Sequence, residues 1–145
     1  MAEDVHVHEI GRGSAQSFFE VEWRQVNEDL FGKPFLWIMQ GEYHLGATRG
    51  HGELLGAARY TIAEGVGYLR ELVVKKGERS RGVGQQLLAR FEDECRRRGC
   101  HKVYLDVAAI NVRAQAFYRR NGWEHEGTMH QHWRKVDFQN WSKWL

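Results

Sequence analysis

The sequence of 145 residues has a single proline, two cysteines and no long apolar run. A transmembrane helix needs about 18 or more consecutive apolar residues, so one is excluded and no membrane partner is expected. With Pro34 alone, proline-rich linkers and stalks are excluded as well. Cys95 and Cys100 have no further cysteine beside them, which fits neither a disulfide scaffold nor a zinc motif. We expect two buried thiols in a reducing compartment.

Neither sign of charge is in excess, because 21 Lys and Arg oppose 19 Asp and Glu and leave a formal net charge of +2. A nucleic-acid partner would need a local basic patch, and none is expected. The paired histidines (His6 with His8, His130 with His132) have no cysteine or acid at a fixed ligand spacing, so no metal site is expected. Residues 1–4 are acidic and no apolar signal-peptide core follows them, so we expect a cytoplasmic protein.

Hydrophobic residues make up 42% of the chain and charged residues 28%, a balance that is typical of a folded globular protein. No repeat, linker or low-complexity tract divides it, and we expect a single domain over residues 1–145. Sixteen glycines indicate many tight turns or close backbone approaches.

The hydrophobic spacing changes along the chain between that of strands and that of helices. Ser17 and Glu20 match a capping box, which predicts a first helix from about Ser17 to Leu30. Gly-containing turns between apolar runs predict antiparallel hairpins, and strands joined through a helix are normally parallel. The fold class is therefore α/β, with a single mixed, mostly antiparallel β-sheet flanked by helices. The expected strands are 5–8, 43–49, 54–62, 68–74 and 102–107 with one or two after Trp123, and the later helices are 83–95 and one capped by Asn111.

The segment from Arg79 to Gly84 has the strongest chemical signal, because it lies between a strand and an amphipathic helix. Backbone N–H groups at such a helix start, together with the helix dipole, bind phosphate oxygens. Gly82 and Gly84 let the backbone approach an anion closely, and Arg79 and Arg81 add charged donors. A nucleoside-triphosphate P-loop is excluded, because no Gly-Lys-Ser/Thr ending is present.

This Arg-x-x-Gly-x-Gly segment, following Leu72-Val73-Val74, resembles motif A of the GNAT superfamily of N-acetyltransferases. A second segment resembles motif B of the same family, from Leu105-Asp106-Val107 through Asn111, Ala114 and Phe117-Tyr118 to Asn121-Gly122. The resemblance covers about residues 52 to 129, with Trp123 where the family usually has Phe. It implies a GNAT-like acyltransferase fold and acetyl-CoA as the co-substrate.

By this resemblance, backbone groups of one strand end would hold the pantetheine arm of acetyl-CoA, and the glycine-containing loop would hold its pyrophosphate. Asn111 would contact the cofactor arm near the thiol, and Tyr118 would lie beside the sulfur. The implied cofactor-binding residues are Leu72, Val73, Val74, Arg79, Ser80, Arg81, Gly82, Val83, Gly84, Asn111 and Tyr118.

Acyl transfer to an amine needs a donor for the departing thiolate and an acceptor for the proton of the amine. Tyr118 is the candidate donor, because a phenol with a pKa near 10 is protonated at neutral pH. Two carboxylates compete as the base. Resemblance to ribosomal-protein alanine N-acetyltransferases, which have Glu-Val at Asp106-Val107, favours Asp106, whereas Glu71 lies on the preceding strand. Alternation predicts Glu71 and Val73 on one face of that strand, and Arg70, Leu72 and Val74 on the other.

These residues together predict an acetyl-CoA-dependent N-acetyltransferase that moves an acetyl group to a primary amine by direct transfer in a ternary complex. The alternative is an acyl-CoA-binding regulatory module with the same fold and no turnover. The acceptor stays open among a protein N-terminus, a lysine, a polyamine, an antibiotic and an amino acid. A homodimer is compatible with the sequence.

Overall fold

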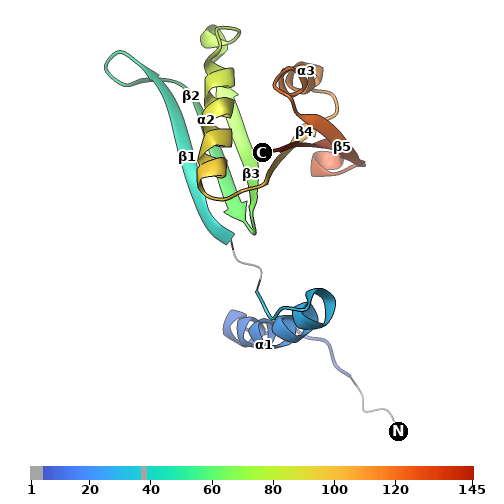
Figure 1. Ribbon diagram of the computed structural model, residues 1–145. Helices are drawn as coiled ribbons and strands as arrows, with labels where there is room; N and C mark the ends of the chain where they lie inside the picture. Colours follow the sequence, from blue (N-terminus) through green and yellow to red (C-terminus); the bar gives the residue numbers. More distant parts are fainter. Residues whose placement is uncertain (1–4, 37–38) are drawn as a thin grey trace. The chain divides into compact units, whose positions relative to one another are not determined.

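The computed structural model describes residues 5–36 and 39–145, so the acidic start at residues 1–4 lies outside the described residues. The chain divides into two compact units, Met1–Ile38 and Met39–Leu145. The first contains one helix, and the second contains the whole β-sheet and the remaining helices (Figure 1).

Helix α1 runs over Arg12–Phe31, so it begins five residues before the predicted start at Ser17. Gly11 precedes its first turn without a side-chain cap, and Gly32, with φ of 72°, ends it through a backbone bond to the carbonyl of Glu28. The prediction of a strand at residues 5–8 is wrong, because these residues have irregular backbone. Alternating residues form a strand only when another strand pairs with them.

The second unit alternates strands and helices in the predicted order. The two-residue turn between the second and third strands has positive φ at both Glu64 and Gly65, as a tight hairpin requires. The elements are β1 (Met39–Arg49), β2 (Glu53–Ala63), β3 (Val66–Val74), the short helix η1 (Lys76–Glu78), α2 (Val83–Arg97), β4 (Lys102–Ala108), α3 (Val112–Arg120), β5 (Glu124–Met129), the short helix η2 (Trp133–Lys135) and β6 (Phe138–Trp144).

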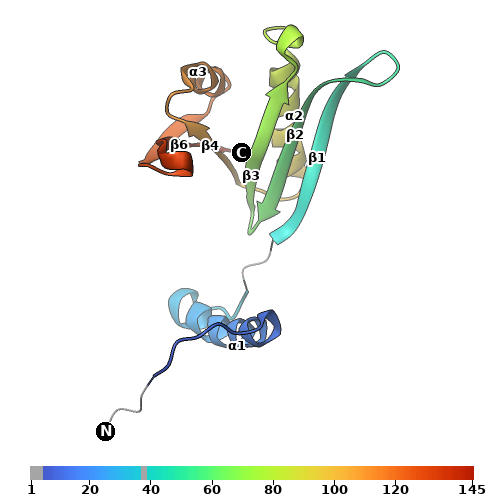
Figure 2. The same cartoon turned by 180° about the vertical axis from the view of Figure 1, so that it is seen from behind.

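The six strands form one sheet in the order β1-β2-β3-β4-β6-β5, in which only β3 and β4 are parallel. This confirms the mixed, mostly antiparallel sheet. Strand β5 forms the edge of the sheet, and β6 then returns to fill the position between β4 and β5. Figure 2 shows β1, β2 and β3 side by side with α2 behind them.

The apolar stripe of α2 covers one face of the first three strands. Phe91 has no exposed surface, and its ring lies 5.0 Å from that of Tyr60 on β2. Cys95 and Cys100 are both free and buried, as predicted. Burial and the neighbouring Cys100 raise the pKa of the Cys95 thiol well above its ordinary value, so Cys95 is protonated and unreactive.

A buried charged group ties α2 to the C-terminal strand. Nε1 of Trp123 donates to Glu92 Oε1 at 2.9 Å, and Nζ of Lys143 donates to Glu92 Oε2 at 2.9 Å. The same Lys143 ammonium donates to the carbonyl of Asn121, just after α3. Because the charges are paired and hydrogen-bonded, their burial is tolerated, and three elements are held in register around the end of α3.

Candidate active site

The parallel pairing of β3 and β4 stops after three residue pairs, the last of which joins Tyr68 to Tyr104. Beyond it, β3 continues to Val74 and β4 continues to Ala108 without pairing, so the sheet is open at this point. Two cavities, of about 790 and 570 Å³, are lined by residues at this opening. Both are lined by Leu72, Val73, Asn111, Ala114 and Tyr118.

The larger cavity is lined by the segment that resembles motif A. Gly82 precedes α2 with φ of 83° and caps it with no side chain, so the first N–H groups of the helix have no side-chain partner. Ser80 also has a positive φ, 64°, in the same loop. Nε of Arg79 donates to the carbonyl of Val74 at 3.0 Å, which fixes the loop against the end of β3. A loop with these free N–H groups fits a phosphate.

Not every residue predicted to bind the pyrophosphate lines this cavity. Arg79, Ser80, Gly82 and Gly84 do. The guanidinium of Arg81 is exposed and lies 3.8 Å from Glu78, and Val83 is half-buried at the start of α2. Roles for these last two residues stay predictions.

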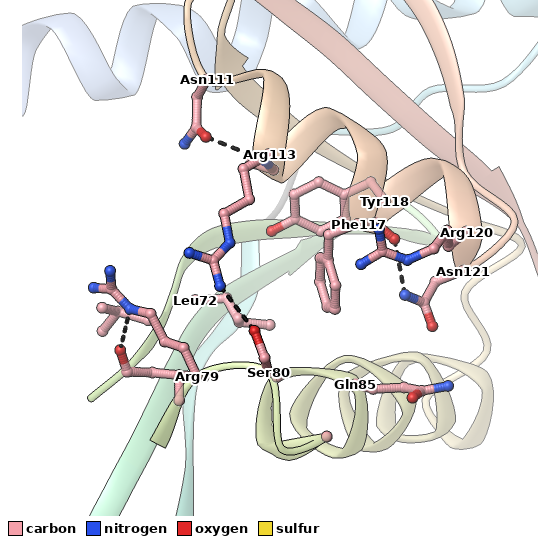
Figure 3. Close-up of a pocket in the computed structure, with 15 residues that line it drawn as sticks. Leu72, Arg79, Ser80, Gln85, Asn111, Arg113, Phe117, Tyr118, Arg120 and Asn121 are labelled. Carbon is pink, nitrogen blue, oxygen red and sulfur yellow. Dashed lines mark hydrogen bonds between the residues drawn. The ribbon is translucent and has the colours of Figure 1, made fainter. Parts of the chain in front are cut away.

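Helix α3 forms the opposite wall, as Figure 3 shows. Oδ1 of Asn111 accepts from the backbone N–H of Ala114 at 3.1 Å, so Asn111 caps the helix as predicted. Arg113 reaches from α3 across the cavity, where its Nη2 donates to Ser80 Oγ at 3.0 Å (Figure 3). This contact joins the two halves of the candidate site, motif A and motif B.

Sequence reasoning gave no binding role to six residues that line the larger cavity. Arg113 brings a second positive charge to the phosphate loop from another helix, and Phe117 lies next to Gly84. Arg113, Phe117 and Arg120 are three or four positions apart on α3, so they share one face of that helix. The six are Gln85, Arg113, Ala114, Phe117, Arg120 and Asn121.

Tyr118 lies between the two cavities and lines both. Its side chain is only 8% exposed, and its ring packs 5.5 Å from that of Trp123. Burial raises the pKa of Tyr118 to about 12, because the phenolate would lose hydration. No group in the described part of the chain hydrogen-bonds to its hydroxyl, so that hydroxyl is available as a donor.

The smaller cavity contains both candidate carboxylates. Asp106 is half-buried on β4, where Oδ2 accepts from the hydroxyl of Tyr68 and Oδ1 accepts from Nδ2 of Asn140, each at 2.6 Å. Glu71 is 64% exposed, and its Oε2 lies 3.2 Å from Nε of Arg59. Asp106 is thus fixed by neutral donors, whereas Glu71 is paired with a cation.

The predicted alternation along β3 is wrong at Arg70. The register against β2 shifts at this point, since Arg59 pairs with Glu71 and Tyr60 pairs with Leu69. Arg70 is the extra residue of a β-bulge, and its guanidinium carbon lies 4.4 Å from the ring centroid of Tyr68. Arg70 therefore lies on the face of Tyr68, and it does not share the core-facing side of Leu72 as predicted. Leu69 and Leu72, three residues apart, both pack in the core, which strict alternation does not allow.

Two kinds of feature are absent from the described residues. None of the helices in residues 5–36 and 39–145 is long and apolar enough to cross a membrane. Over the same ranges, no group of three or more His, Cys, Asp or Glu side chains is arranged to hold a metal ion. His130, one of the paired histidines, lies 3.2 Å from the carboxylate of Asp137 instead.

Solved structures of acetyltransferases share this fold. An acetyltransferase from Bacillus cereus ATCC 14579 superposes with a TM-score of 0.73 at 22% identity, over 97% of this chain and 98% of that one. A ribosomal-protein-alanine N-acetyltransferase from Brucella melitensis gives 0.64 at 24% identity, over 94% and 80%. A Bacillus anthracis str. Ames acetyltransferase, solved in complex with acetyl coenzyme A, gives 0.63 at 19% identity, over 67% and 59%.

Two sequence comparisons agree with the structural ones. The uncharacterized protein YxbD of Bacillus subtilis (strain 168) is 24% identical over an alignment 123 residues long, which covers 79% of this chain and 70% of that protein. The model of the acetyltransferase (GNAT) family matches residues 12–123, which include the phosphate loop, both candidate carboxylates and Tyr118. The chain belongs to the GNAT family of acetyltransferases.

Proposed function

We propose that this protein is an acetyl-CoA-dependent N-acetyltransferase that moves the acetyl group to a primary amine by direct transfer in a ternary complex. The observation that carries the proposal is the position of Tyr118, which lines two cavities of different character. One has a phosphate-binding loop and the other has carboxylates, so a cofactor and an amine can meet at this side chain.

The larger cavity is the proposed acetyl-CoA site. The uncapped start of α2, with Ser80 and Gly82, would hold the pyrophosphate, and Arg79 and Arg113 would supply opposite charge. Because every other backbone group of an antiparallel strand faces away from its partner, Leu72–Val74 can bond the pantetheine arm through the open edge of β3. Asn111 would lie along the same arm, toward the thiol. Acetyl-CoA supplies the activated acetyl group as a thioester.

Tyr118 is the proposed donor to the departing sulfur. A thiol with a pKa near 8.5 leaves as a thiolate, which is stabilised by a hydrogen bond from a phenol that is still protonated. With its pKa raised to about 12, Tyr118 keeps its proton across the physiological range. Its burial also excludes water from that bond.

The attacking amine must be neutral, although an amine with a pKa near 10.4 is mostly protonated at neutral pH. Asp106 is the proposed acceptor of that proton, directly or through one water. Its two oxygens are oriented by Tyr68 and Asn140 and keep lone pairs for a third partner. Glu71 is the competing base, and its ion pair with Arg59 makes it the weaker candidate.

An assay of thiol release across a panel of amines tests the proposal. The purified chain is supplied with acetyl-CoA and with amines of each open acceptor class, and free thiol is followed against a no-acceptor control. We expect release that depends on one class. Tight calorimetric binding of acetyl-CoA with no release from any amine would favour the regulatory module instead.

A further inference from the structure

One arginine at the smaller cavity has no acidic partner among the described residues. Arg70 lines this cavity from the β3 bulge, and its guanidinium stacks on the ring of Tyr68 at 4.4 Å. Its neighbour across the sheet, Arg59, is paired with Glu42 at 3.4 Å and with Glu71 at 3.2 Å. In the described part of the chain, no carboxylate pairs with Arg70, so its donors remain available to a ligand.

Asp106 contacts the hydroxyl of the same tyrosine. The hydroxyl of Tyr68 donates to Asp106 Oδ2, whereas Arg70 lies over the ring face of Tyr68. Burial and the bond to Asp106 raise the pKa of Tyr68, so it is fixed as the donor. A cation on the ring face and an anion at the hydroxyl are thus held by one phenol side chain, and both line one cavity.

Arg70 and Asp106 are the charged side chains of this cavity that form no ion pair within the described residues. Arg70, Glu71 and Asp106 are the charged residues that line it, and Glu71 is already paired with Arg59, which also contacts Glu42. The remaining residues of its wall are apolar or uncharged: Leu69, Leu72, Val73, Leu105, Val107, Ala108, Asn111, Ala114, Tyr118 and Phe138. A ligand with one positive and one negative group complements this arrangement better than a simple amine does.

We propose that the acceptor is an amine that also carries a carboxylate, with its amino group at Asp106 and its carboxylate on Arg70. The inference rests on the proposed function and names its substrate class. A guanidinium fork matches the two oxygens of a carboxylate, which favours a carboxylate over other anions as its partner. The β-bulge supplies the geometry, since bulges redirect side chains next to active sites.

The reaction balances with these groups. The amino nitrogen attacks the acetyl carbonyl carbon, a C–N bond forms and the thioester C–S bond breaks. The neutral amine gives up one proton to Asp106, and Tyr118 gives a proton to the departing sulfur, which ends as a free thiol. Tyr118 regains its proton from solvent, and Asp106 loses its proton to solvent. Arg70 takes no part in the bond changes, so it is a substrate-binding residue. The products are an N-acetylated amino carboxylate and coenzyme A.

Matched acceptors test the proposal on the full chain. Each α-amino acid is compared with its carboxamide and with its decarboxylated amine, by thiol release from acetyl-CoA. We expect at least one free amino acid to exceed its carboxamide in kcat/KM by about tenfold or more, the range of one lost charged contact. Arg70→Gln should remove that preference through KM, Arg70→Lys should retain part of it, and carboxamide rates should stay within about twofold.

Arg90→Gln is the matched control, because Arg90 is an exposed arginine on α2 that pairs with Glu94 away from both cavities. It should keep the wild-type preference. Release only from carboxamides or decarboxylated amines, or an unchanged KM in Arg70→Gln, would overturn this inference and leave the transferase proposal standing. Release from no amine at all, with acetyl-CoA binding intact, would overturn both.

Discussion

The hydroxyl of Tyr118 provides a test at the scale of one atom. Tyr118→Phe removes only that oxygen from a side chain packed against Trp123, so the fold and acetyl-CoA affinity should be retained. Turnover should fall by roughly 10²–10⁴-fold, the contribution of a positioned general acid. Steady-state thiol release and calorimetry measure the two effects. Full activity in this variant would assign protonation of the thiolate to water.

The pH profile of the wild type adds a second readout for the same group. The folded-state pKa of Tyr118 is raised to about 12, so the phenol stays a donor as pH rises from about 7 to about 10. No basic limb from Tyr118 should appear in that interval. Tyr43→Phe is the matched control, because its ring stacks on Tyr60 and lines neither cavity. It should keep wild-type turnover.

Gly82 provides a test of the phosphate loop. A Cβ there meets no atom within 4 Å, but the φ of 83° is one that L side chains rarely adopt. We expect Gly82→Ala to lose at least about tenfold in acetyl-CoA affinity, and Gly82→Val more, because the strained loop turns its N–H groups away from the phosphates. Calorimetry measures the affinity.

Gly77→Ala is the control for this loop, since Gly77 also has open space around its Cβ but no positive φ. Its affinity should match the wild type. Circular dichroism checks that all three glycine variants fold. A folded Gly82→Val variant with unchanged affinity would contradict the assignment of the loop.

Single residues were predictable where a local rule fixes their role. Asn111 caps α3 because a short amide suits that position, whatever the rest of the fold does. Arg113 was not predictable, because its contact with Ser80 joins residues 33 positions apart. The position of Arg70 was not predictable either, because the alternation of residues along a strand does not reveal a β-bulge.

Strands β3 and β4 each present one carboxylate to the smaller cavity, which allows a comparison between elements. Asp106→Asn and Glu71→Gln each remove one charge with little change in volume. We expect Asp106→Asn to lose more turnover, because Asp106 is oriented by two neutral donors while Glu71 is held by Arg59. The kcat of each variant, measured over a range of pH, makes the comparison.

The reverse result, with Glu71→Gln inactive and Asp106→Asn normal, would transfer the base role to β3. Normal rates and an unchanged acidic limb in both variants would leave deprotonation to ordered water. The two variants serve as controls for each other, because both remove a carboxylate from the same cavity.

Elements were predicted well where periodicity and end signals agree. Helix α2 has both an amphipathic stripe and a glycine stop, and its start at Val83 was found. For α1 the capping box at Ser17 suggested a later start than Arg12. A helix extends through any residues that do not break it, and a serine is tolerated in its interior. The start of a helix therefore depends on whether the residues before a possible cap can also be helical, and not on the capping residue alone.

At the scale of the whole molecule, the order of strands depends on contacts that no local pattern encodes. The mixed sheet followed from helix crossovers, but the insertion of β6 between β4 and β5 did not. Glu92 and Lys143, 51 positions apart, meet in the buried ion pair that holds α2 and β6 together. Charged residues are ordinarily expected to be exposed. The sequence alone therefore does not predict a buried pair of this kind.

The early end of β3–β4 pairing has a consequence for amide hydrogen exchange. Alternate N–H groups of Glu71–Val74 face the opening instead of β2, so they should exchange with solvent faster than their neighbours along the strand. Acetyl-CoA should slow these amides selectively if its arm takes the place of the missing strand. Amides of Ala58 and Tyr60, on β2, serve as the internal control. Uniform protection that acetyl-CoA leaves unchanged would contradict this, whereas selective slowing would mean that the sheet becomes continuous only when the co-substrate is bound.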